Sequence, residues 1–265
     1  MATAEFIILI GLLGLAVGSF LNVCIDRLPK GLSIVALPSH CERCQHRLKP
    51  LDLVPVLSYL WLRGRCRYCK VAIPWRIPLG EAVTGLLFAY VAFRYEVTLE
   101  TVVVLGFVGV LIVVFFIDLE HSLILDRVMY PAVAAALLVV PVGPLGQGQD
   151  ALHAYIDAFL GIAIGGGTLA MIYFGALRML GQDAFGWGDV KLGVFLGAIL
   201  GVTQTLVALP LSFISGGLLG LTLLILKVRG RKDAIPFGPF LAVAGLVSLF
   251  WGQTIFNWYR GIFPN

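Results

Sequence analysis

The sequence predicts an all-α membrane protein with about eight transmembrane helices and one small metal-binding unit. Hydrophobic residues fill 59% of the 265 positions, and charged residues fill only 13%, well below the roughly 25% of a typical soluble domain. Long uncharged runs recur along the chain, close to the roughly 20 residues that cross a bilayer core. Four of the five cysteines form two closely spaced pairs in the only long polar segment.

The first apolar run, residues 6–25, has no basic segment before it, so we expect a retained span rather than a cleaved leader. Residues 26–76 are polar, basic and interrupted by proline and glycine, and are predicted to be a soluble unit. Residues 77–265 are predicted to form a seven-span domain. Its apolar runs are 77–93, 101–117, 128–142, 158–177, 192–226 and 236–258.

The run at 192–226 is too long for one crossing, because its 35 residues would form a helix of about 50 Å. A bilayer core is about 30 Å thick. We therefore expect this run to divide near residues 201–204 into two spans. The glycines within the spans, including Gly165, Gly166 and Gly167, are expected to let helices approach closely.

The basic residues are distributed unevenly along the chain. With the 26–76 segment placed in the cytoplasm, 17 of the 19 Lys and Arg residues fall on the inner side, and only Arg94 and Arg260 fall outside. This asymmetry is typical of membrane proteins. It predicts that both termini lie on the outer side of the membrane, and it makes membrane lipid rather than a nucleic acid the expected partner of this chain.

Cys41 and Cys44 form one CxxC pair, and Cys66 and Cys69 form another, 21 residues further on. Two such turns can close a tetrahedral zinc site. Four sulfur ligands leave no open position, so the predicted role of the metal is structural. His40 and His46 flank the first pair and could replace a ligand, although a surface role is expected for both.

Two aspartates stand where apolar runs begin or end. Asp118 follows a 17-residue uncharged run, and Asp189 follows Gly186-Trp-Gly188 at the start of the 192–226 run. Ionisable residues at such positions are candidates for function, and a pair of carboxyl groups can activate water against a peptide carbonyl. An aspartate at the start of a helix is, however, also an ordinary cap.

Asp126 is an alternative to Asp118 as the first of the two catalytic carboxylates. Glu120 and His121 are further candidates for that role. Lys191 could hold a substrate carbonyl or extend to the membrane surface. Glu81 could pair with a basic residue of the 26–76 segment or line the substrate entry, and a structural pairing is expected. Asp157, at the start of the 158–177 run, is expected to be an N-cap.

Two segments resemble the type IV prepilin peptidases, a family of GxGD intramembrane aspartyl proteases. Residues 186–191 (GWGDVK) are similar to its GxGD-x-K motif. Residues 118–126 resemble its first aspartate motif, with Ile124-Leu125-Asp126 where the family usually has Ile-Pro-Asp. Residues 18–23, 27–29 and 236–240 resemble its other signatures, so the resemblance covers essentially the whole chain.

The resemblance implies two activities. Such enzymes cut the basic leader from type IV prepilins or pseudopilins on the cytosolic side, and then methylate the new amino terminus with S-adenosylmethionine. The resemblance implies that Asp118 and Asp189 are the catalytic pair. It also implies that Gly186, Gly188 and Lys191 lie near the substrate and that the four cysteines are zinc ligands. It associates methyl transfer with residues 18–76, without identifying the residues that contact the methyl donor.

Three other interpretations remain open at this point. A non-enzymatic membrane adaptor would need the cysteines but not the aspartates. A transporter would favour acids near the membrane midplane, whereas these acids lie toward one face. A peptidase without methyl transfer is the third.

Overall fold

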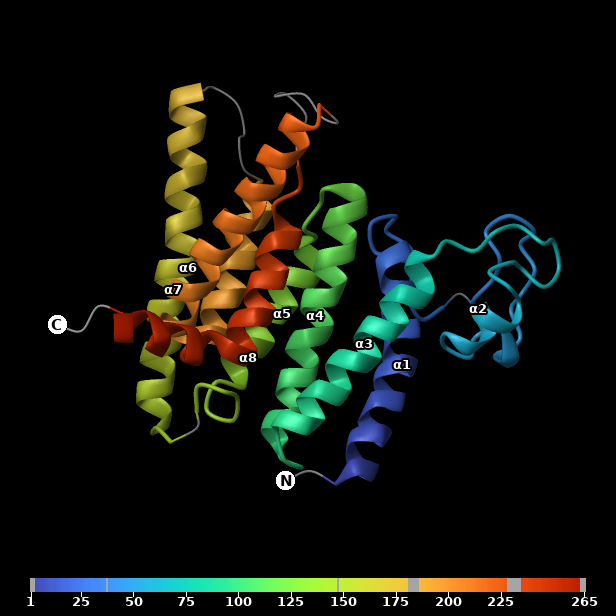
Figure 1. Ribbon diagram of the computed structural model, residues 1–265, viewed down its shortest axis with the longest axis horizontal. Coiled ribbons are helices and arrows are strands. Elements are labelled where there is room, and N and C mark those ends of the chain that lie inside the picture. The colour runs from blue at the N-terminus through green and yellow to red at the C-terminus, as the bar shows by residue number, and fades with distance from the viewer. Residues whose placement is uncertain (1–2, 37, 147, 181–185, 228–234, 263–265) are drawn as a thin grey trace. The chain divides into compact units, whose positions relative to one another are not determined.

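The computed structural model describes residues 3–36, 38–146, 148–180, 186–227 and 235–262 (Figure 1). Two compact units are present, Met1–Val113 and Val114–Asn265. The elements in chain order are α1 (Ala4–Arg27), the 3₁₀ turn η1 (Pro50–Asp52), α2 (Leu57–Trp61), α3 (Arg76–Arg94), α4 (Leu99–His121), α5 (Asp126–Leu138), α6 (Ala151–Leu180), α7 (Trp187–Ile225) and α8 (Gly238–Ile262).

The prediction of an all-α, multi-pass membrane protein is confirmed, with a different helix count. Six of the described helices, α1, α3, α4, α6, α7 and α8, are long and apolar enough to cross a membrane. The 128–142 span was predicted too long, because α5 has 13 residues and ends at Leu138. The apolar residues that follow, Val140 and Leu145, pack instead against Ala154 and Ala158 near the start of α6.

The expected division of the 192–226 run is present. The backbone of α7 is non-helical at Gly201 (φ 64°, ψ −167°), a conformation that favours glycine. An N-cap role expected for Asp157 at the start of its own helix is wrong, since α6 begins at Ala151. The Asp157 carboxylate instead accepts a hydrogen bond from the Val202 N–H, 3.0 Å away, directly after the break.

In the Met1–Val113 unit, α1 and α3 lie against each other along a row of glycines. A Cβ on Gly14 would lie 2.6 Å from the Phe88 Cβ, and one on Gly18 would lie 2.8 Å from the Glu81 Cα. Small residues therefore set the separation of these helices. Large apolar side chains elsewhere on α1 are exposed, as expected of a surface that meets lipid: Ile8, Leu9, Leu12 and Leu13.

In the Val114–Asn265 unit, α7 packs against α6, α8 and α5 (Figure 1). Gly161 and Gly165 of α6 meet Gly197 and Gly193 of α7 at backbone contact distance. The expected packing role is confirmed for Gly165 and Gly166, whereas Gly167 faces open space. Three basic residues used in the charge count, Arg229, Arg231 and Lys232, lie outside the described residues.

Candidate functional site

The four predicted cysteine ligands come together in the segment between α1 and α3, here called the knuckle (residues 28–75). The sulfur atoms of Cys41, Cys44, Cys66 and Cys69 all lie within 4.8 Å of one another. The Cys41 and Cys69 Sγ atoms are 3.8 Å apart. A tetrahedral zinc site with Zn–S bonds of about 2.3 Å has edges of about 3.8 Å. This cluster could hold a metal ion.

Both CxxC pairs are built by the same backbone turn. The Cys41 N–H donates to the His46 carbonyl, and the Gln45 N–H donates back to the Cys41 carbonyl. The second pair repeats this pattern between Cys66, Val71 and Lys70. Gln45 and Lys70 each follow the second cysteine of a pair and have positive φ values of 57° and 59°. The repeat turns both pairs of thiols toward one point.

The thiols affect one another's ionisation. The Cys44 backbone N–H donates to the Cys41 sulfur and lowers the pKa of that thiol to about 7. The Val71 N–H lowers the pKa of Cys69, but removal from water and the neighbouring thiols outweigh it and raise that pKa to about 11. Four thiolates this close repel one another unless a cation lies between them.

The flanking histidines are not part of the cluster. His46 stacks on the Tyr68 ring, with 3.7 Å between centroids, and the His40 Nδ1 lies 3.1 Å from the Pro38 carbonyl oxygen. The Asp52 carboxylate links the two halves of the knuckle, 2.6 Å from the Arg67 Nε. Burial would raise the pKa of Asp52, but the hydrogen bond from Arg67 outweighs it and holds that pKa below its usual value.

Asp118 lies in the last turn of α4 and is only 5% exposed. The negative end of the helix dipole disfavours a carboxylate there, so the capping explanation does not apply to it. Its carboxylate accepts a hydrogen bond from the Gly238 backbone N–H. Its Oδ2 has no hydrogen-bond partner within the described part of the chain.

Asp189 lies in the first turn of α7 and is 7% exposed. Its Oδ2 accepts a hydrogen bond of 3.2 Å from the N–H of Gly186, the residue that caps this helix. Trp187 packs against Tyr173 and Phe174 of α6 and so fixes the start of α7. Capping therefore explains where one oxygen of Asp189 lies, but not the burial of the group.

The two buried carboxyl groups are close enough to interact electrostatically. Ile124, from the loop between α4 and α5, contacts the backbone at Gly188, next to Asp189, and at Gly238, which contacts Asp118. A Cβ on Gly188 would lie 2.7 Å from the Ile124 Cβ, and one on Gly238 would lie 3.1 Å from the Ile124 Cδ1. Sequence reasoning missed the contacts of Ile124 and Gly238. The signals were the 236–240 motif, which contains Gly238, and the Ile124-Leu125-Asp126 stretch, and sequence alone gave neither Ile124 nor Gly238 a role.

The competing acids lie in different surroundings. Asp126 begins α5, and its side chain is 55% exposed and paired with the Lys191 ammonium. The Lys191 Nζ also lies 5.3 Å from the centre of the Tyr130 ring. Glu120 and His121 are exposed. Among these acids, only Asp118 and Asp189 combine burial with mutual proximity.

Comparison with known proteins agrees with this arrangement. Residues 12–95 match the bacterial peptidase A24 N-terminal domain, and residues 105–221 match the type IV leader peptidase family. The chain belongs to the type IV leader peptidase family. No solved structure matches it.

Several relatives in this family share the name prepilin leader peptidase/N-methyltransferase. The chain is 35% identical to the protein of Aeromonas salmonicida (strain A449), over 95% of this chain and 92% of that protein. It is 36% identical to the protein of Pseudomonas putida, over 97% and 94%. The Bacillus subtilis (strain 168) protein is 30% identical, over 93% and 94%. Because each similarity extends over almost the full length of this chain, the aligned region includes the knuckle and both aspartates.

Proposed function

We propose that this protein cleaves the leader peptide of type IV prepilins or pseudopilins and then methylates the new amino terminus. The observation that carries the peptidase half is the pair of buried carboxyl groups, Asp118 and Asp189, held together at one end of α4 and α7. The name shared by the relatives supports both halves.

The proposed cleavage needs one water molecule and one proton shared between Asp118 and Asp189. The ionised carboxylate accepts a proton from the water while the water oxygen attacks the scissile carbonyl carbon. The protonated carboxyl group donates its proton to the carbonyl oxygen. Collapse of the tetrahedral intermediate then breaks the C–N bond, and the amine leaves with the proton taken from the water. Gly186 and Gly188 are proposed to lie near the substrate because they belong to the turn that carries Asp189, and Lys191 joins α7 to α5 through Asp126.

The proposed metal is a structural zinc ion, held by Cys41, Cys44, Cys66 and Cys69. When bound, S-adenosylmethionine would supply the methyl group, and the proposed region for this step is residues 18–76. This assignment rests on the relatives' shared name and on the resemblance. The contacts of the methyl donor are not assigned to any residue.

The proposed location is a bacterial inner membrane, with the knuckle and both aspartates on the cytosolic side and the termini in the periplasm. The supporting observation is that ten of the 19 Lys and Arg residues lie between Arg27 and Arg76, the segment that joins the first two spans. Residues 1–25 would form the first span, 26–76 the zinc-binding unit and 77–265 the peptidase domain. Prepilins and membrane lipid are the proposed partners, with no nucleic acid.

The direct test incubates the purified protein with a model prepilin and follows the products by mass spectrometry. We expect loss of the leader mass without S-adenosylmethionine, and a further gain of one methyl mass on the shortened product when it is added. If the folded, metal-loaded protein leaves the prepilin intact, the adaptor interpretation is favoured. If the leader is lost without methylation, only the peptidase half stands.

A Gly238→Ala substitution is expected to reduce cleavage by about 10²-fold, the scale of a small misplacement at a reacting centre. The added Cβ would lie 2.5 Å from the Asp118 Oδ2 and would displace that carboxyl group. Gly217→Ala is the matched control, because nothing lies within 4 Å of its added Cβ. Equal cleavage rates for the two purified variants would contradict the role given to Gly238.

Removal of the metal is expected to unfold the knuckle while the spans stay folded. Within the described residues of the 28–75 segment, the helical elements are the short η1 and α2, so the segment depends on the cysteine cluster for its shape. A Cys66→Ser variant, or chelation of the native protein, should lower bound zinc and expose this segment to limited proteolysis. Cys24→Ser is the control, since Cys24 is buried at the end of α1 outside the cluster. An unchanged digestion pattern in zinc-free protein would contradict this expectation.

A further inference from the structure

The short helix α2 of the knuckle exposes a compact apolar face. Leu57, Leu60 and Trp61 occupy positions i, i+3 and i+4, and are therefore neighbours on one side of the helix. Their exposed fractions are 63%, 65% and 84%. A large aromatic side chain left this open, beside two exposed leucines, needs an apolar partner.

A buried hydrogen bond fixes the level of α2 along the spans. Val56 caps the N-terminus of α2, and its N–H donates to the Glu81 Oε2 over 2.7 Å. Glu81 is 6% exposed and also accepts a hydrogen bond from the Ser19 hydroxyl of α1. It lies five residues inside α3, about 7.5 Å below the start of that helix at 1.5 Å per residue. Glu81 thus has a structural pairing, but its partners are the Val56 N–H and the Ser19 hydroxyl instead of the expected basic residue.

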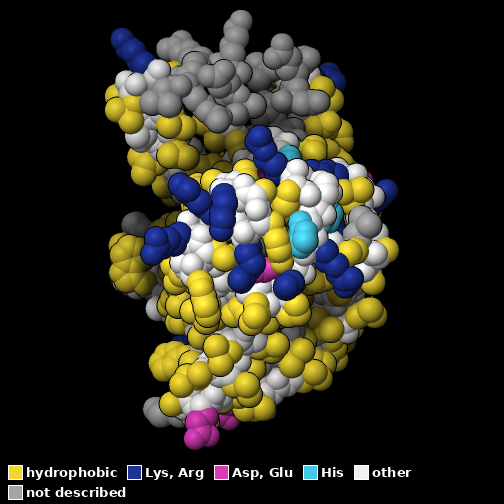
Figure 2. Space-filling model, turned by 90° about the vertical axis from the view of Figure 1, so that its right-hand side faces the viewer, with side chains coloured by type: hydrophobic (Ala, Val, Ile, Leu, Met, Phe, Trp, Pro, Cys, Tyr) yellow, Lys and Arg dark blue, Asp and Glu magenta, His cyan; other side chains and the backbone are white. Residues whose placement is uncertain are grey.

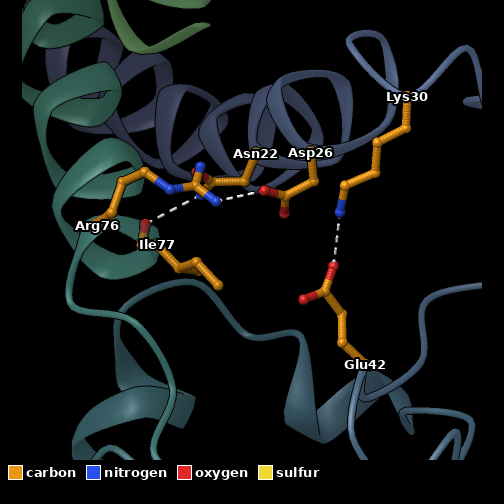
Figure 3. A network of polar contacts seen from close by, with 6 residues as sticks. All are labelled: Asn22, Asp26, Lys30, Glu42, Arg76 and Ile77. Atoms are coloured by element: carbon orange, nitrogen blue, oxygen red, sulfur yellow. Dashed lines mark hydrogen bonds and ion pairs between the residues drawn. The ribbon is translucent and has the colours of Figure 1, made fainter. Parts of the chain in front are cut away.

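A polar network marks where α1 and α3 leave the apolar layer (Figure 3). The Arg76 guanidinium donates to Asp26 and to the Asn22 Oδ1, and the Asn22 Nδ2 donates to the Ile77 carbonyl. These residues belong to the last turns of α1 and the first turn of α3. Since Glu81 lies one turn further into α3, α2 begins at the level of the membrane boundary, and Figure 1 shows it beside the first turns of α3.

The surroundings of α2 have the composition of a membrane interface. Trp75, which precedes α3, is 71% exposed, and tryptophan is enriched at the level of lipid headgroups. Arg63 and Arg65 follow α2 directly and are exposed. Lys and Arg side chains gather over the knuckle face, above a mainly apolar region (Figure 2). Apolar anchors beside basic residues match an anionic bilayer surface.

We propose that α2, together with Trp75, docks the knuckle onto the anionic surface of the membrane that α1 and α3 cross. Leu57, Leu60 and Trp61 enter the boundary between headgroups and acyl chains, and Arg63 and Arg65 face the phosphates. The buried Glu81 carboxylate holds α2 at that depth through the Val56 N–H. The knuckle therefore lies along the membrane rather than projecting into water. This docking depends on neither proposed activity.

Photo-crosslinking of the full-length protein tests this proposal. A benzophenone amino acid replaces Trp61 in one variant and Glu42 in another, since Glu42 is a knuckle residue with a side chain 80% exposed. Both are reconstituted into vesicles of phosphatidylethanolamine and phosphatidylglycerol, irradiated and analysed by mass spectrometry. We expect phospholipid adducts at position 61 in several-fold higher yield than at position 42. Equal yields, or adducts at position 61 only with the protein's own residues 114–265 or with an added pilin, would overturn the proposal.

The role of Glu81 is tested in the Trp61 benzophenone protein. Glu81→Gln keeps an oxygen that can accept from the Val56 N–H, whereas Glu81→Leu removes it. Lipid adducts should persist with Gln and fall several-fold with Leu, with bound zinc unchanged in both. Equal adduct yields in the two variants would show that Glu81 does not hold α2 at the membrane.

Discussion

Replacing either Asp118 or Asp189 by Asn is expected to reduce prepilin cleavage by about 10³-fold or more, the scale of general acid–base catalysis. An amide of nearly the same shape can neither accept the proton of the attacking water nor donate one to the scissile carbonyl. Because both groups are buried and interact with each other, neither can be replaced by a neighbouring acid. The rate should be measured with purified variants and a model prepilin.

Asp126→Asn is the discriminating control, because Asp126 is exposed and paired with Lys191. It should cleave far faster than the other two variants. Methylation of an already shortened pilin peptide should survive in Asp118→Asn and Asp189→Asn, since that activity is proposed for residues 18–76. If Asp118→Asn cleaved at the wild-type rate and Asp126→Asn did not cleave, Asp126 and not Asp118 would be the catalytic partner of Asp189.

Gly197→Ala is expected to destabilise the protein by more than about 3 kcal/mol, beyond the usual cost of overpacking. The added Cβ would lie 2.3 Å from the Gly161 carbonyl oxygen and 2.5 Å from the Ile162 nitrogen. Both are backbone atoms of α6, so no side-chain rotation relieves the clash. Helices α6 and α7 would have to separate, and the first turn of α7 carries Asp189. Thermal unfolding in detergent measures the effect.

Gly167→Ala tests the same chemical change on α6 without the clash, because nothing lies within 4 Å of its added Cβ. Alanine favours a helix over glycine by up to about 1 kcal/mol, so this control should unfold at the native temperature or slightly above it. Coincident melting curves for the two variants would show that close contact between α6 and α7 is not needed for stability.

Local sequence patterns predicted those features that depend on nearby residues. The CxxC spacing identified all four members of the cysteine cluster, since each turn is closed by backbone hydrogen bonds within six residues. The length of the 192–226 run predicted the break at Gly201. Composition, however, did not distinguish a membrane-crossing run from an apolar turn that packs on a neighbouring helix. It therefore extended the fourth span to Val142, past the end of α5 at Leu138.

Contacts between residues distant in sequence could not be predicted. Asp157 was assigned to its own helix, but its partner Val202 lies 45 positions away. Gly238 lies far from Asp118 in the chain, and only the folded helices bring its N–H to that carboxylate. The aspartates themselves were found because a carboxyl group beside a long uncharged run is unusual. Their proximity depends on the tertiary fold, in which Gly238 contacts Asp118 and Ile124 contacts Gly188.

The interruption at Gly201 also affects how the protein opens and closes locally. Where Asp157 supplies the hydrogen bond to Val202, the ladder of backbone hydrogen bonds does not continue from one part of α7 to the other. Fraying that begins near Ile225 can therefore stop at the break, and amide hydrogens of residues 202–225 can exchange with solvent water while those of residues 187–200 stay protected. Local unfolding at the far end of α7 is therefore expected to leave the turn that carries Asp189 folded.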